Sequence, residues 1–206
     1  AVQRHDGRFL QAAGGTLFAA FPALYAAAFS GFYLPLMIVL WLLLFLALGI
    51  ELRHHIDNPL WHQLWDVAFS GASLLLALFF GAALGNLVRG LPLNEAGEFF
   101  EPLWTDFRVG EVTGILDWYT LLVGVTATLA LTLHGALWFS LKTEAELQTR
   151  AKTVVRQLWP VLLLLTIATT AASASVQPQL WLNVTRYPLG VVLPLLAFAG
   201  LAGTRL

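Results

Sequence analysis

The chain has 206 residues, of which 58% are hydrophobic and only 11% are charged, with a formal net charge of −1. Soluble domains have about 45–50% apolar and about 25% charged residues, so this composition indicates a membrane-embedded helix bundle. The near-neutral charge excludes a globally basic nucleic-acid binder, and the absence of cysteine excludes disulfides, iron–sulfur ligation and thiolate metal sites. We expect a single membrane domain over residues 1–206, an all-α polytopic transmembrane bundle of about six spans.

The first element is an uncharged run of 42 residues, Phe9–Ile50. As one helix it would be about 63 Å long at ~1.5 Å per residue, roughly twice a hydrocarbon core of about 30 Å. The run therefore predicts two spans with a turn between them. Pro22 is the preferred turn, because proline ends or kinks helices, and this choice gives spans at Ala1–Ala20 and Tyr25–Ile50. The alternative turn is Ser30–Gly31.

The next segment, residues 51–66, is polar and rich in tryptophan and histidine. We expect a short interfacial helix after Pro59, because Trp61 and Trp65 are four residues apart and share a helix face. The segment also holds three histidines and two aspartates that could be considered as metal ligands: His54, His55, His62, Asp57 and Asp66. Their spacing matches no metal-ligand pattern, so it favours a solvated loop and no metal site.

Four further stretches carry no charged residue apart from His134 and are predicted to be membrane spans. Their lengths of 22, 24, 20 and 18 residues are close to the ~20 needed to cross a bilayer: Val67–Val88, Trp118–Leu141, Gln157–Val176 and Tyr187–Thr204. Within the first of them, Gly81-xxx-Gly85 predicts ordinary close packing of helices rather than a cofactor groove. Thr143 precedes Glu146 by three residues, which predicts a capping box at a helix start before the fifth span.

The distribution of basic residues in the loops predicts the orientation of these spans. Eight of the eleven basic residues fall on one side, which we assign to the cytoplasm: Arg4, Arg8, Arg53, Lys142, Arg150, Lys152, Arg156 and Arg205. The other three, Arg89, Arg108 and Arg186, fall on the outer side. The longest connection, residues 89–117, then lies outside the cell.

Two polar residues in or beside the spans are candidate functional sites, because ionisable groups at membrane depth are costly. Asp6 lies near the cytoplasmic end of the first span, where it is a candidate for a proton pathway or for an ion pair with Arg4 or Arg8. His134 lies inside the fourth span, where the candidate role is a polar contact with a neighbouring helix.

Eight strings of residues, in order along roughly the first three quarters of the chain, point to a family. They are HDG (5–7), GGTLFAAFPALYAAAFSGFY (14–33), IELR (50–53), LWHQLWD (60–66), GAALGNLVRGLPL (81–93), GILDWYTLLVG (114–124), LHGAL (133–137) and TEAELQTRA (143–151). With these strings the chain resembles subunit II of the cytochrome bd-type quinol oxidases, including the cyanide-insensitive branch. The opening motif departs from the family's Trp-Asp-Gly pattern, since His5, Phe9 and Gln11 replace the expected types while Asp6 is kept.

The resemblance implies a haem-free subunit that packs against a haem-bearing subunit I in a bacterial cytoplasmic membrane. Haem b and haem d are then expected in the partner, a structural quinone is present in some members, and Asp6 would contribute to a proton route from the cytoplasm. The reaction would be oxidation of quinol with reduction of dioxygen to water. Compared with the family, the chain lacks the first span and the C-terminal spans, so we expect a piece of a longer subunit.

Two other readings of the residues are a small multi-pass transporter and a membrane assembly factor without a redox connection. A transporter would be expected to show inverted repeats or broken helices near the midplane, and Pro160 and Pro194 do not supply that pattern.

Overall fold

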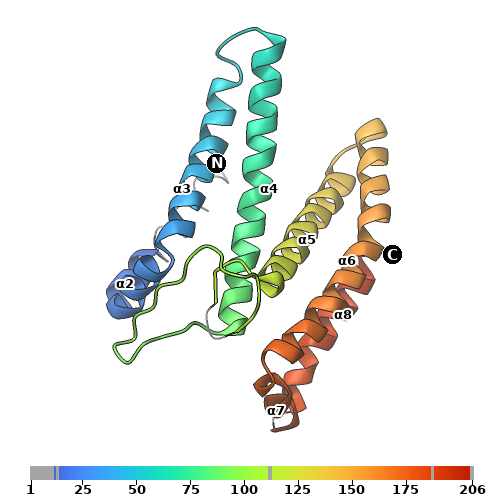
Figure 1. Ribbon diagram of the computed structural model, residues 1–206. Helices are drawn as coiled ribbons and strands as arrows, with labels where there is room; N and C mark the ends of the chain where they lie inside the picture. Colours follow the sequence, from blue (N-terminus) through green and yellow to red (C-terminus); the bar gives the residue numbers. More distant parts are fainter. Residues whose placement is uncertain (1–11, 13, 111–112, 187, 205–206) are drawn as a thin grey trace.

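The computed structural model describes residues 12, 14–110, 113–186 and 188–204, and the regular secondary structure in this part of the chain is entirely helical. Four helices are long and apolar enough to cross a membrane (Figure 1): α3 (Tyr33–Leu52), α4 (Pro59–Arg89), α5 (Trp118–Lys142) and α6 (Ala145–Val176). They correspond to four of the predicted spans. The all-α polytopic bundle is therefore confirmed.

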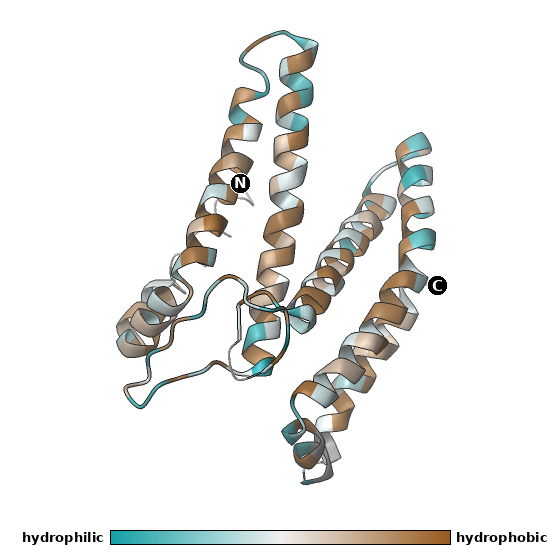
Figure 2. Ribbon diagram, in the orientation of Figure 1, coloured by the Kyte–Doolittle hydropathy of each residue, from teal (hydrophilic) through white to brown (hydrophobic). Residues whose placement is uncertain are grey.

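Successive long helices run in opposite directions, with α4 packed between α3 and α5, and α5 packed against α6. The α3–α4 and α5–α6 connections lie at one end of the bundle and the long connection, residues 90–117, lies at the other (Figure 1). This arrangement places Arg53 and Lys142 at the same end, as the loop-charge argument requires. Figure 2 shows hydrophobic residues along the middle of the helices and hydrophilic residues toward the turns.

The N-terminal part differs from the predicted pair of spans. The stretch Tyr25–Ile50 is not one continuous helix, because α2 (Pro22–Gly31) and α3 are separated at Phe32, whose backbone leaves the helical region. The break lies beside the alternative turn at Ser30–Gly31, and Pro22 marks the start of α2. Helix-type hydrogen bonds from Phe32 N to Ala28 O and from Leu36 N to Phe32 O continue through the break, so the chain kinks there instead of reversing.

The span predicted at Ala1–Ala20 lies largely outside the described residues. The span predicted at Tyr187–Thr204 is also altered, because a 3₁₀ turn η1 (Pro188–Val191) precedes α8 (Val192–Gly203). Twelve residues make a helix of about 18 Å, which is shorter than the hydrocarbon core. A short helix α7 (Gln179–Arg186) joins α6 to this segment, and Trp159 Nε1 of α6 donates a hydrogen bond to Leu201 O of α8 at 2.9 Å.

Two local predictions about helix starts are wrong. No separate interfacial helix follows Pro59, because this residue begins α4 and the helix continues without a break to Arg89. The side chain of Asn58 caps that start by accepting a hydrogen bond from Leu60 N at 2.9 Å. The predicted capping box of Thr143 and Glu146 is also absent: the Thr143 hydroxyl instead donates to Phe139 O at 2.6 Å, at the end of α5.

Glycines bring α4 and α5 into backbone contact, as the Gly81-xxx-Gly85 motif predicts. A Cβ atom on Gly81 would lie 2.6 Å from the Cβ of Ala127 and 2.7 Å from the Cα of Gly124. One on Gly124 would lie 2.8 Å from the backbone oxygen of Leu78. Small residues at such crossings allow the close packing that holds membrane helices together. The α4–α5 pair is therefore closely packed at its backbone.

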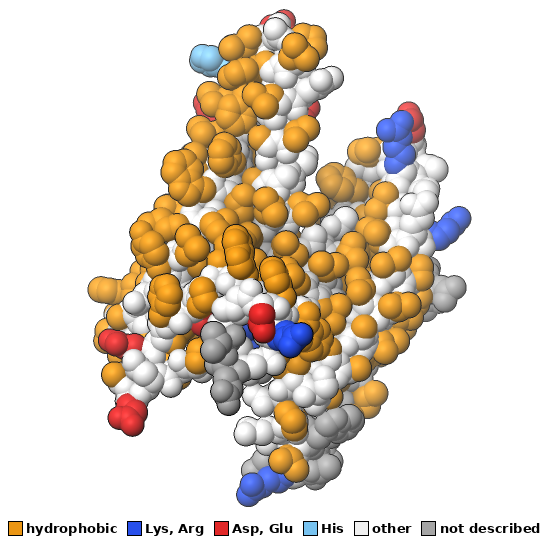
Figure 3. All heavy atoms as spheres, in the orientation of Figure 1, with side chains coloured by type: hydrophobic (Ala, Val, Ile, Leu, Met, Phe, Trp, Pro, Cys, Tyr) orange, Lys and Arg blue, Asp and Glu red, His pale blue; other side chains and the backbone are white. Residues whose placement is uncertain are grey.

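Few residues of the long helices are buried within this chain. In the face seen in Figure 3, hydrophobic side chains follow the helices along their length, and charged side chains appear mainly toward the ends. In the most apolar part of α3 only 6% of residues are buried. Such a surface requires lipid or other protein around it, since an apolar face of this size is not stable in water.

Candidate functional site

Of the two candidate residues predicted from the sequence, only His134 lies among the described residues. Asp6 lies outside the described residues. His134 lies in α5 with an exposed side chain, and no hydrogen bond to it is found in the part of the chain that the structure describes. The polar contact predicted for His134 therefore stays a prediction.

The histidines of residues 51–66 form no candidate centre. The rings of His54 and His62 have centroids 6.4 Å apart, while Asp66 is paired with Arg53 through contacts of 2.6 Å (Nε–Oδ1) and 3.1 Å (Nη2–Oδ2). Hydrogen bonding to the Asp66 carboxylate raises the pKa of Arg53 above its ordinary value. Across the described ranges, the structure has no group of three or more His, Cys, Asp and Glu residues that could hold a metal ion.

A buried cluster of charges lies where α4 ends and α5 begins, and it is the most extensive polar site among the described residues. At its centre is Arg89, the last residue of α4, whose side chain is only 3% exposed. Its Nη2 donates to Glu101 Oε1 at 2.7 Å and to Asn86 Oδ1 at 2.8 Å. Its Nη1 donates to Gly114 O at 2.8 Å and to the Asp117 carboxylate. One guanidinium thus joins the end of α4 to three positions in the long connection.

Asp117 has a second function as the N-terminal cap of α5. Its Oδ1 accepts hydrogen bonds from the backbone N–H groups of Tyr119 and Thr120, both at 2.8 Å. The Asp117 backbone N–H donates in return to Thr120 Oγ1 at 2.8 Å, which completes a capping box. A carboxylate at a helix N-terminus is also favoured by the helix dipole. Asp117 therefore fixes the start of α5 and binds Arg89 with the other oxygen.

The cluster contains two carboxylates and one guanidinium. Glu101 is 2% exposed, and its Oε1 accepts from both Arg89 and the hydroxyl of Thr113, the latter at 2.8 Å. Glu101 Oε2 and Arg89 Nε are buried, and neither has a hydrogen-bond partner among the described residues. Because breaking a buried ion pair leaves a desolvated charge, each partner depends strongly on the others. The cluster fastens the connection 90–117 to the membrane helices.

Sequence reasoning did not find this cluster, because Arg89, Glu101 and Asp117 read as ordinary charges of an outer loop. They are 12 and 16 residues apart, and no periodic pattern links them. A local signal was present only at Asp117, which precedes Thr120 by three residues directly before an apolar stretch, as expected of a helix cap. The tertiary contacts of Arg89 and Glu101 have no such signal.

Polar contacts also join α5 to α6 within the bundle. The Tyr119 hydroxyl and the Ser173 hydroxyl are 2.8 Å apart, and the hydroxyls of Thr126 and Thr169 are 2.9 Å apart. Tyr119 is 1% exposed. Hydrogen bonds between helices contribute modestly to the stability of membrane bundles. Together with the glycine contacts between α4 and α5, these hydrogen bonds join α4, α5 and α6 into one packed unit.

Phe99 anchors the long connection at the opposite side, against the kink between α2 and α3. Its ring lies 4.9 Å from the Phe32 ring in an edge-to-face arrangement. A Cβ on Gly31 would lie 2.3 Å from a ring carbon of Phe99, so only glycine leaves room for this ring. The connection is thus held at both sides of the bundle by buried side chains.

Comparisons with known proteins identify the family. The family described as "Cytochrome bd terminal oxidase subunit II" matches residues 8–206. A protein of Haemophilus influenzae named "Probable cytochrome oxidase subunit 2" is 41% identical over 146 residues, which are 71% of this chain and 37% of that protein.

Two relatives carry more specific names. "Cytochrome bd-I ubiquinol oxidase subunit 2" of Escherichia coli K12 is 36% identical over 144 residues, 70% of this chain and 37% of the relative. "Cytochrome bd ubiquinol oxidase subunit 2" of Bacillus subtilis is 31% identical over 167 residues, 81% of this chain and 46% of the relative. The matches thus span less than half the length of these relatives. The chain belongs to the cytochrome bd terminal oxidase subunit II family.

Proposed function

We propose that this chain is part of the haem-free subunit II of a bacterial membrane quinol:dioxygen oxidoreductase, which oxidises quinol and reduces dioxygen to water. The observation that carries the proposal is the family match over residues 8–206, together with two relatives named as ubiquinol oxidase subunits. Four apolar helices of spanning length support a location in the membrane. The bias of basic residues toward the α3–α4 and α5–α6 end supports assigning that end to the cytoplasm.

The residues of this chain favour haems b and d in a partner subunit. Haem iron is usually held by His, Cys or Met, and this chain has no Cys and a single Met. His134 is the only described histidine beyond the first turn of a long helix, and its side chain is exposed. The described residues therefore do not fit a buried multi-haem centre, and we assign electron transfer to the partner.

The proposed role of this chain toward that partner is support of assembly. A subunit that packs against another in a membrane needs a rigid framework and apolar faces that remain uncovered. The α4–α5 pair provides the framework through its glycine contacts and the Arg89 cluster. The nearly unburied α3 provides an apolar face that a haem-bearing subunit and lipid would cover. A structural quinone would be a further occupant between such faces.

A second proposed role is proton uptake from the cytoplasm through Asp6. Reduction of dioxygen to water consumes protons, which must cross a low-dielectric region. Arg4 and Arg8, on either side of Asp6, favour its charged form over the neutral form that burial alone would favour. Asp6 is therefore proposed as an entry point that collects protons, rather than as a store of one proton.

The test is quinol-driven oxygen uptake by the assembled oxidase across a range of pH, with Asp6→Asn compared with wild type. We expect a lower rate whose pH dependence differs from wild type, with an unchanged haem spectrum. Asp57→Asn is the matched control, because it removes an exposed carboxylate at the predicted cytoplasmic end. Identical rates and pH profiles for Asp6→Asn and wild type would refute the proton role.

A further inference from the structure

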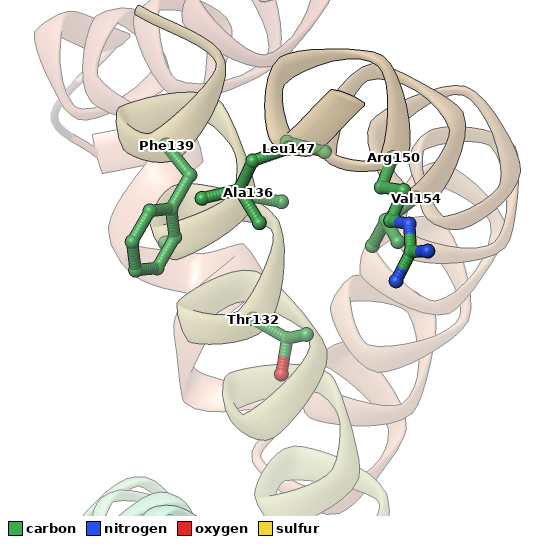
Figure 4. Close-up of a pocket in the computed structure, with 8 residues that line it drawn as sticks. Thr132, Ala136, Phe139, Leu147, Arg150 and Val154 are labelled. Atoms are coloured by element: carbon green, nitrogen blue, oxygen red, sulfur yellow. The ribbon is translucent and has the colours of Figure 1, made fainter. Parts of the chain in front are cut away.

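A groove between α5 and α6 lies directly below their connecting turn. It has a volume of about 370 Å³ and is lined almost entirely by apolar groups. Figure 4 shows Ala136 and Phe139 of α5 opposite Leu147 and Val154 of α6, with Thr132 toward the deeper end and the Arg150 side chain on the α6 side. This volume is within the range of small-molecule pockets, roughly 300–1,000 Å³.

The groove follows the helices over most of one leaflet of a bilayer. Thr132 and Phe139, the first and last residues of α5 that line it, are seven residues apart, which corresponds to about 10 Å along the helix. Half of a hydrocarbon core is about 15 Å. A lipid chain that enters near the turn would therefore be covered by the groove over about two thirds of its leaflet.

One cationic side chain lines the groove. Arg150 lies on its α6 wall, and among the described residues its guanidinium has one ion-pair contact, from Nη2 to Glu146. Both side chains of that pair are more than 70% exposed, so the pair contributes little stability and leaves further N–H donors for another anion. Apolar walls beside this guanidinium match a lipid with a negatively charged headgroup.

We propose that this groove binds one acyl chain of an anionic phospholipid, with the lipid phosphate contacting Arg150. The lipid belongs to the leaflet on the side of the α5–α6 turn, which the loop charges assign to the cytoplasm. Gly135 contributes the open space, since a Cβ on this residue would meet no atom within 4 Å.

The test uses the protein purified from membranes with any associated subunits, stripped of lipid and mixed with equal amounts of dioleoylphosphatidylglycerol and dioleoylphosphatidylcholine. Native mass spectrometry counts the retained lipids. Wild type is expected to hold one tight phosphatidylglycerol at this site in about fivefold preference over phosphatidylcholine, the effect of one cation near an anionic headgroup. Arg150→Gln should lose that preference, and Arg150→Lys should keep most of it.

Gly135→Leu should release one lipid per complex regardless of headgroup, because its side chain occupies the groove. Gly71→Leu is the matched control, since Gly71 is also helical with open space around it and lies outside the groove. Lys152→Gln removes an exposed cation of the same helix outside the groove and should change nothing.

Equal retention of the two lipids by wild type would overturn the proposal. So would an equal loss of phosphatidylglycerol in Lys152→Gln and Arg150→Gln. Displacement of the lipid by excess inorganic phosphate, with Gly135→Leu behaving as wild type, would show a phosphate site without a lipid chain and would also refute it.

Discussion

Replacing Arg89 by leucine should detach the connection 90–117 from the membrane helices. The substitution leaves the carboxylates of Glu101 and Asp117 buried together without their cation, with exposed side-chain fractions of 1% each in the wild type. Removing one partner of a buried ion pair typically costs about 3–5 kcal/mol. Because α4 and α5 remain packed through their glycines, this cost falls mainly on the connection 90–117.

A loss of about 3–5 kcal/mol should raise the equilibrium constant for local opening of the connection at least a hundredfold. Limited trypsin digestion of the protein in detergent measures it, because Arg108 is an exposed cleavage site within the connection. Cleavage at Arg108 should become correspondingly faster in Arg89→Leu, while the helical circular dichroism of the bundle stays close to wild type.

Glu101→Gln is the informative companion to Arg89→Leu. Glutamine keeps an oxygen acceptor for Arg89 and Thr113 and removes one of two negative charges from a site with a single cation. We expect a change within about 1 kcal/mol, which is less than tenfold in cleavage rate. Equal cleavage rates for Arg89→Leu and wild type, or a larger effect of Glu101→Gln than of Arg89→Leu, would refute the view that Arg89 balances buried carboxylates.

Three further predictions concern unfolding in mixed detergent micelles, followed by circular dichroism as dodecyl sulfate is added. Gly81→Leu should destabilise the bundle by about 1–3 kcal/mol because its side chain meets backbone atoms of α5, whereas Gly71→Leu should stay near wild type. Tyr119→Phe should cost about 0.6 kcal/mol through loss of the contact with Ser173, and a cost above about 2 kcal/mol would contradict a simple interhelical hydrogen bond. Arg53→Gln, which removes an exposed salt bridge, should leave the unfolding transition close to that of wild type.

The sequence predicts the membrane class and the long helices well, because length and lack of charge determine both. Trp118–Leu141 and the observed Trp118–Lys142 differ by one residue. Element ends set by competing hydrogen bonds are predicted less well. Thr143 could cap the helix that follows or the helix that precedes, and the structure uses it at the end of α5.

The charged cluster shows a different limit of sequence reasoning. The sequence places Arg89 at the end of an apolar stretch, but it does not indicate which groups bind the guanidinium. In the structure these are Asn86, Glu101, Gly114 and Asp117. Only the fold of the connection determines which of its six acidic residues become buried. The kink at Phe32 also involves a contact between residues far apart in the sequence. There Phe99 of the connection packs against Gly31 and Phe32.

The most direct test of the proposed function is purification of the protein through a tag on this chain, followed by a visible absorption spectrum and separation of the subunits. A subunit II should bring a second polypeptide with haem b and haem d bands, and the haem should remain with that partner once the two are separated. A colourless preparation without a haem-bearing partner, or haem that stays with this chain after separation, would contradict the account.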